Sequence, residues 1–198
     1  MKSKFLLVLV SALVLAVPAQ SSAVWLLEGN AGVGLPQGDF GDFWASGLLI
    51  GASVGYLSAP FEIGADVNFL SNDPSDDYQE ILDTADATDE FKFTQYGVHA
   101  RWMPPMEDKL SPYLGVGVAA YQLKENYEDS FGTEDVSSTS LGVNLKGGTN
   151  FWLGPKFGIG ADVTYHMVWP DEEEVGHDNA SFIGLQAGLR YKLGAPAP

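Results

Sequence analysis

The chain has 198 residues, a formal net charge of −16 and no cysteine. This length indicates one domain, the lack of cysteine excludes a disulfide framework, and the strong negative charge argues against nucleic acid as a partner. Charged residues make up only 18% of the chain, below the roughly 25% of an average soluble domain.

The first 23 residues have the three parts of a secretory signal peptide. Lys2 and Lys4 give a basic start, the apolar run 5–17 follows, and Ser21-Ser22-Ala23 supplies the small residues that a signal peptidase reads. An N-terminal membrane anchor is the alternative, but the apolar run is short for a bilayer span. We therefore expect a signal peptide over residues 1–23, a barrel domain over 24–194 and a short Ala/Pro tail over 195–198.

Eight stretches of the mature chain alternate apolar and polar side chains with a period of two, which predicts β-strands. Their expected ranges are Val24–Leu35, Gly47–Leu57, Phe61–Ser71, Glu90–Met103, Pro112–Lys124, Ser138–Trp152, Lys156–Trp169 and Ala180–Leu193. Each reaches the roughly 9–11 residues with which a tilted strand crosses a bilayer. No apolar stretch after the signal is long enough for a transmembrane helix.

The connections between these stretches alternate between long and short. The long ones are 37–45, 72–89, 125–136 and 170–179, and they hold most of the 26 acidic residues. Short periplasmic turns and longer external loops are typical of bacterial outer-membrane barrels. The sequence therefore predicts an all-β fold, an eight-stranded antiparallel up-and-down transmembrane β-barrel.

Charged residues within the strands fall almost entirely on the polar parity, opposite the apolar one. A narrow barrel of eight strands fills its interior with side chains, and charge on the lipid face is costly, so we expect these residues to point into the lumen. The predicted structural network of ion pairs consists of Glu28, Glu62, Asp66, Arg101, Lys146, Asp162, Arg190 and Lys192. Lys92 and Lys124 are exceptions on the apolar parity, at loop-side strand ends.

Particular ion pairs follow from the expected strand register. Pairing Phe151 with Phe157 across the turn 153–155 would place Lys146 directly opposite Asp162. Similar depths in the barrel make Glu62 with Arg101, and Glu28 with Arg190, further expected pairs. Unpaired buried charge is expensive, so these pairs are expected to fill the lumen rather than to form a gate or a proton pathway.

Phe91 and Phe93 break the alternation, because their parity is opposite to that of Tyr96 and Trp102. Two explanations remain open: a β-bulge near residues 94–95, or a strand that has already left the membrane at that point.

Three sequence segments resemble the small outer-membrane β-barrel proteins of the OmpA/OmpX/OmpW-like group: residues 29–42, Pro112–Val118 and Gln186–Leu193. The last segment is similar to the assembly signal of that group, formed here by Gln186, Gly188, Tyr191 and Leu193. The resemblance implies a bacterial outer-membrane location without a cofactor. It implies outer-membrane lipid or lipopolysaccharide and the barrel assembly machinery as partners, and an extracellular ligand or surface as a possible loop partner.

Four functional hypotheses remain. The first is a structural or surface-interaction barrel with acidic external loops, and the second is a narrow pore or a path for small apolar solutes. The third is a soluble lipocalin-like carrier. The fourth is a lipid A-modifying enzyme, but the inward-parity His99 and His166 favour hydrogen bonding in the lumen, and Val168 stands where such an enzyme would place its serine. The acidic loops could bridge divalent cations, but they contain no calcium-loop motif.

Overall fold

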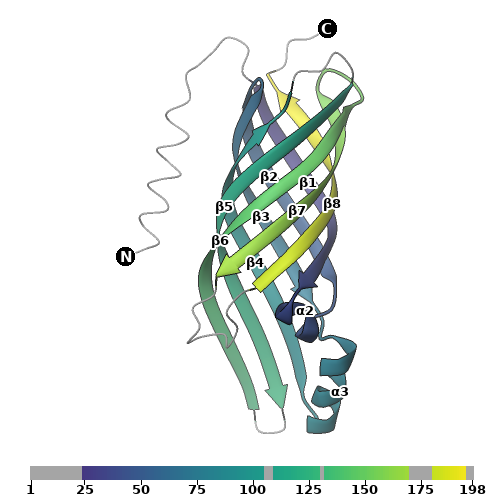
Figure 1. Cartoon of the computed structure of the whole chain (residues 1–198), viewed down its shortest axis with the longest axis vertical. Coiled ribbons are helices and arrows are strands. Elements are labelled where there is room, and N and C mark those ends of the chain that lie inside the picture. The colour runs from purple at the N-terminus through teal and green to yellow at the C-terminus, as the bar shows by residue number, and fades with distance from the viewer. Residues whose placement is uncertain (1–23, 105–108, 130–131, 170–179, 195–198) are drawn as a thin grey trace, which may run out of the picture.

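The computed structural model is a closed barrel in which each strand is bonded antiparallel to the next and β8 returns to β1 (Figure 1). It describes residues 24–104, 109–129, 132–169 and 180–194. The strands are β1 (Val24–Gln37), β2 (Gly47–Ser58), β3 (Phe61–Asn72), β4 (Thr88–Trp102), β5 (Leu110–Asp129), β6 (Gly132–Trp152), β7 (Phe157–Trp169) and β8 (Ala180–Leu193). The expected eight-stranded barrel is confirmed, whereas the expected signal peptide and tail lie outside the described residues.

The two faces of the barrel wall follow the predicted parity. Large apolar side chains cover the outside of the strands, and Leu114, Leu141 and Leu189 are among the most exposed of them. Side chains of the opposite parity, including Arg101 and Arg190, are buried in the lumen. Such an outer surface is unfavourable in water and suited to lipid.

The ends of the barrel differ in the length of their connections. Trp25 near the start of β1 pairs with Leu193 at the end of β8, so both ends of the barrel chain lie with the short turns. By the general rule for bacterial barrels this is the periplasmic end, and we call the opposite end the outer end. None of the helices in the described residues is long and apolar enough to cross a membrane.

Two helices lie at the outer end, one in each of the first two long connections (Figure 1). The short helix α2 spans Asp39–Phe43, and α3 spans Asp76–Ala85. The side chain of Ser75 caps α3 by accepting a hydrogen bond from the backbone N–H of Tyr78, and acidic residues fill the first turn, where the helix dipole favours them. The acidic connection 72–89 therefore holds an ordered helix.

The third long connection is mostly strand, which corrects the expected loop 125–136. Strands β5 and β6 stay paired from Leu110↔Phe151 out to Asp129↔Gly132, so the connection itself is only two residues long. Strand β7 pairs with β6 only as far as Trp169↔Leu141. Strand β4 stays paired with β5 out to Thr88↔Glu128, so β4, β5 and β6 together project past the other strands, as Figure 1 shows. The sequence pattern did not predict this part of β5 and β6, because neither of its faces is apolar.

The turn between β6 and β7 also differs from the expected one. Phe151 pairs with Ile159 rather than with Phe157, and the N–H of Leu153 donates to the carbonyl of Phe157. This centres the turn on Pro155, whose fixed φ suits a turn and which has no N–H to give to the ladder. Every cross-strand partner in this hairpin therefore shifts by two residues relative to the prediction.

Candidate functional site in the barrel lumen

A cluster of two arginines and two glutamates lies across the lumen in its periplasmic half. Arg101 Nη1 is 2.8 Å from Glu28 Oε2 and 3.3 Å from Glu62 Oε1. Arg190 Nη2 is 2.6 Å from Glu28 Oε2, and its Nη1 is 3.8 Å from Glu62 Oε2. All four side chains are buried, so each charge depends on the others for compensation. The structure thus brings together both pairs expected between these strands.

Tyr113 on β5 joins the two arginines to a carboxylate on β7. Its ring centroid is 5.1 Å from Arg101 Cζ and 4.9 Å from Arg190 Cζ, which is the geometry of cation–π contacts. Its hydroxyl donates to Asp162 Oδ2 at 3.1 Å. Tyr113 was not among the predicted lumen residues because it carries no charge, although it has the same inward parity as Gly115 and Gly117.

Lys146 and Asp162 also meet, but not as directly opposed residues. Lys146 pairs with Thr164 and Asp162 with Gly148, so the two charges are diagonal neighbours with Nζ 3.7 Å from Oδ1. The expected face-to-face pairing is wrong because of the shifted turn. Lys192 is placed apart from the other charges, with its Nζ 3.5 Å from the centroid of the Trp152 ring.

A belt of hydrogen-bonded polar groups lies next to the charge cluster. Asp66 Oδ1 is 2.8 Å from His99 Nδ1, and Glu62 Oε1 is 3.5 Å from His99 Nε2. Asp66 also accepts a short hydrogen bond from Gln95. The belt therefore joins β3 to β4 inside the lumen. It includes Asp66, the one predicted carboxylate that forms no ion pair with an arginine or lysine among the described residues.

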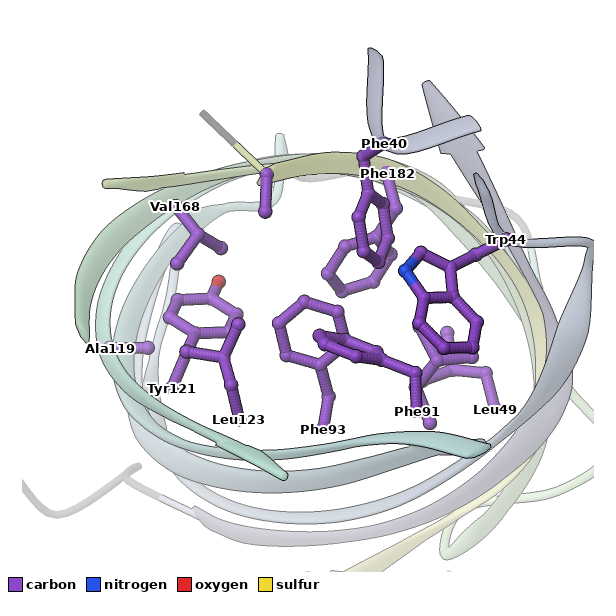
Figure 2. Close-up of a cluster of buried hydrophobic side chains, with 12 residues drawn as sticks. Phe40, Trp44, Leu49, Phe91, Phe93, Ala119, Tyr121, Leu123, Val168 and Phe182 are labelled. Carbon is purple, nitrogen blue, oxygen red and sulfur yellow. The ribbon is translucent and has the colours of Figure 1, made fainter. Parts of the chain in front are cut away.

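The outer half of the lumen is filled by apolar side chains, which we call the aromatic cluster (Figure 2). Phe93 lies at its centre, with ring centroids 5.3 Å from Phe182 and 6.2 Å from Tyr121. His166 stacks on Phe182 at 4.1 Å, and its Nδ1 is 2.9 Å from the Tyr121 hydroxyl. The buried members are Phe40, Trp44, Leu49, Leu70, Phe91, Phe93, Ala119, Tyr121, Leu123, Val168, Ala180 and Phe182.

The aromatic cluster explains the anomalous parity of Phe91 and Phe93. The β3–β4 ladder is unbroken from Asn72↔Phe91 to Phe61↔Trp102, so the first of the two explanations, a bulge near residues 94–95, is wrong. Both rings point into the lumen, as their parity with His99 and Arg101 requires. The inward residues in the outer half of the lumen are therefore mostly apolar.

Loops at the outer end complete the aromatic cluster. Phe40 of α2 contacts Phe91 and Phe93, with ring centroids 5.2 Å and 5.7 Å away, and Trp44 packs 5.0 Å from Phe91. Backbone hydrogen bonds join the two helical connections, from Ala45 N–H to the Asp73 carbonyl and from Ser75 N–H to the Phe43 carbonyl. The helices thus cover the cluster and attach the first connection to the second.

The residues of the predicted assembly signal take both faces of β8. Gln186 points into the lumen and donates to Asn30 Oδ1 at 2.7 Å, whereas Tyr191 and Leu193 are exposed on the lipid side. Gly188 must be small, because a Cβ there would lie 2.6 Å from the carbonyl oxygen of Gly29. Their reading by an assembly machine stays a prediction.

Replacing Asp162 by Asn should destabilise the barrel by about 1–3 kcal/mol, because the carboxylate accepts bonds from Tyr113 and Thr164 and faces Lys146. Chemical unfolding in detergent micelles measures this. Glu80→Gln, which removes an exposed charge of α3 beyond its first turn, is the control and should change the free energy of unfolding by less than about 0.5 kcal/mol. Equal effects of the two variants would contradict the role of Asp162.

No metal centre accompanies these groups: among the described residues, no three His, Cys, Asp or Glu side chains are arranged to hold an ion. The described lumen therefore offers charge pairs, hydrogen bonds and packed aromatic rings. An apolar exterior around such a closed sheet defines a transmembrane β-barrel.

Comparisons with known proteins identify the family. The model of the outer membrane protein beta-barrel domain matches residues 5–192, so the chain belongs to this family of bacterial outer-membrane barrels. A search of curated proteins finds no match.

Solved structures share the fold at low sequence identity. Neisserial surface protein A is 19% identical with a TM-score of 0.65, and the match covers 85% of this chain and 97% of that one. A major outer membrane protein of Thermus thermophilus is 14% identical with a TM-score of 0.60, covering 85% and 99%. Ail of Yersinia pestis, solved with the heparin analogue sucrose octasulfate, is 16% identical with a TM-score of 0.54, covering 88% and 100%.

Proposed function

We propose that this protein is a closed outer-membrane barrel with a structural and surface-interaction role, in which the lumen stabilises the barrel and the acidic outer end meets the surroundings. The observation that carries the proposal is the filling of the lumen by two successive layers. The four-charge cluster occupies the periplasmic half, and the aromatic cluster occupies the outer half under α2 and α3. An eight-stranded barrel filled in this way leaves no continuous water path.

The proposed role does not include catalysis. His99 contacts Asp66 and Glu62 inside the lumen, and His166 is stacked on Phe182, so both histidines serve the packing of the interior. Lipid and the barrel assembly machinery are the partners that any such barrel requires. We further propose that secretion uses cleavage after Ala23.

Reconstitution into planar bilayers tests the closed lumen. We expect the purified protein to give no steady channel current above that of protein-free bilayers, because water would have to displace the paired charges and the packed rings. Glu28→Ala with Phe93→Ala in one chain removes a side chain from each layer and should produce measurable conductance. Steady single-channel currents from the unmodified protein would overturn the closed-barrel proposal.

The charge of the outer end limits its partner. Helices α2 and α3 and their flanks expose carboxylates and no basic side chain; those described are Asp39, Asp42, Asp73, Asp76, Asp77, Glu80, Asp83 and Asp86. We propose that this surface meets cationic groups or divalent ions and repels polyanions of the kind bound by Ail of Yersinia pestis. Retention on immobilised heparin at low salt would contradict this.

A path for small apolar solutes is the second candidate. The observation that favours it is the apolar character of the outer half of the lumen, where Phe91, Phe93 and Phe182 meet. Uptake of an apolar fluorescent dye by cells with and without the protein separates the candidates. Faster uptake that is lost when Phe93 is replaced by Glu would support the solute path.

A further inference from the structure

The basic residues of this acidic chain are distributed unevenly over the barrel. Of the ten Lys and Arg residues, Lys2 and Lys4 precede the barrel, three lie in the lumen and three lie near its periplasmic end. The three in the lumen are Arg101, Lys146 and Arg190. The three near the periplasmic end are Lys109, Lys156 and Lys192. Only Lys92 and Lys124 remain for the outer half, and they occur together.

Lys92 and Lys124 lie directly opposite each other on the lipid side of β4 and β5. Both side chains are exposed, whereas their inward neighbours Phe93 and Leu123 are buried in the aromatic cluster. Like charges directly opposite across two strands repel each other, so this lysine pair is unfavourable unless negative groups compensate it.

The described part of the chain compensates only half of this charge. Glu90, two residues away on the same face, places Oε2 2.6 Å from the Nζ of Lys92. No carboxylate oxygen among the described side chains forms an ion pair with Lys124. Counting the described side chains alone, the pair therefore keeps a net positive charge, whereas α2, α3 and their flanks are negative.

The height of the lysine pair matches the outer border of a membrane. Trp102, an exposed ring at the periplasmic end, lies ten residue steps along β4 from Lys92. At about 3.3 Å per residue and a tilt of about 40° this is about 25 Å along the barrel axis, the height of the apolar band of such barrels. Tyr96, exposed on the same face, lies within that band.

The lysine pair is also surrounded by hydrogen-bonding side chains of the outward parity. Ser71 is opposite Lys92 on β3, and Ser137 is opposite Lys124 on β6. One step closer to the membrane, Thr94 is opposite Gln122. Two ammonium groups with hydroxyl and amide groups around them, just above an apolar wall, match a phosphorylated sugar headgroup that carries acyl chains.

We propose that Lys92 and Lys124 form a binding site for the phosphate of a phosphorylated glycolipid in the outer leaflet, with its acyl chains along the wall below. The phosphate supplies the negative charge that no described side chain supplies to Lys124, and it holds the two ammonium groups together. This inference rests on the location of the barrel in an outer membrane and is independent of the closed lumen.

Binding of bisphosphorylated lipid A and of its phosphate-free counterpart to the full mature protein, in detergent with EDTA, tests the site. Native mass spectrometry counts the bound lipid. Lys92→Gln with Lys124→Gln should weaken binding of the phosphorylated lipid about 30-fold and leave the phosphate-free lipid unaffected. Lys109→Gln with Lys156→Gln makes the same change in net charge at the periplasmic end and should leave both affinities as they were.

Two further variants sharpen the result. Lys92→Arg with Lys124→Arg keeps both charges and should retain binding, whereas Glu90→Gln removes the competing carboxylate and should strengthen it severalfold. An unboiled sample that migrates as a folded barrel on a gel establishes that each variant has folded. Equal losses in the two double-glutamine variants, or equal affinity of the unmodified protein for the two lipids, would overturn the site. Conductance of the same preparation tests only the proposal of a closed lumen, so it is separate from the test of the lysine site.

Discussion

Replacing Arg101 by Met should lower the free energy of unfolding of the barrel by about 3–5 kcal/mol, the cost of breaking a buried ion pair by removing one partner. Arg101 is buried and bridges Glu28 at 2.8 Å and Glu62 at 3.3 Å. Met has a similar volume but no charge, so Arg190 would be the only arginine left to pair with the two carboxylates. Equilibrium unfolding in urea, with the protein refolded into lipid vesicles, measures the loss.

A second replacement separates charge balance from packing. Arg101→Met with Glu62→Gln leaves Glu28 with Arg190, which are 2.6 Å apart, so the double variant should be more stable than Arg101→Met alone. Lys156→Met, at the periplasmic turn, is the control and should change stability by less than about 0.5 kcal/mol. If the double variant is the less stable one, the four charges do not act as a balanced cluster.

The architecture and the charge cluster could be predicted from the sequence because a charged side chain on the lipid face of a barrel is energetically costly. A mid-bilayer Arg costs about 2–4 kcal/mol, so the inward parity of Arg101 and Arg190 was strongly determined. The pairs Glu62↔Arg101 and Glu28↔Arg190 could be predicted because the two residues of each pair lie at similar distances from the periplasmic ends of their strands. Where the turn position was open, around Pro155, the prediction was wrong by two residues.

The aromatic cluster could not be predicted because the lumen accepts both polar and apolar side chains, whereas the lipid face excludes charged ones. Parity places Phe91, Phe93 and Phe182 in the lumen, but parity alone does not say that the outer half of a lumen can be apolar. That depends on Phe40 and Trp44, which reach the cluster from a connection without alternation. The inward parity of Phe91 and Phe93 was a signal that these two rings lie in the lumen, but it does not show which side chains they pack against.

Replacing Phe93 by Ala should cost about 3–5 kcal/mol, the usual range for a large aromatic residue in a packed core. Its ring meets Phe40, Phe91, Tyr121 and Phe182, four residues from three strands and one helix. These neighbours are held by the closed sheet and by α2, so they cannot collapse far into the space left behind. To measure the effect, the protein is refolded into lipid vesicles and its unfolding in urea is followed by tryptophan fluorescence.

Phe69→Ala is the matched control, because Phe69 has the same side chain but is 45% exposed on the lipid side of β3. Both variants lose the free energy of transferring a benzyl group out of water. Lipid chains fill the space left at Phe69, whereas a cavity remains at Phe93. Phe93→Ala should therefore cost more than Phe69→Ala, and Phe93→Leu should recover part of the difference. Equal losses at the two positions would mean that the outer half of the lumen is loosely packed and open to small apolar molecules.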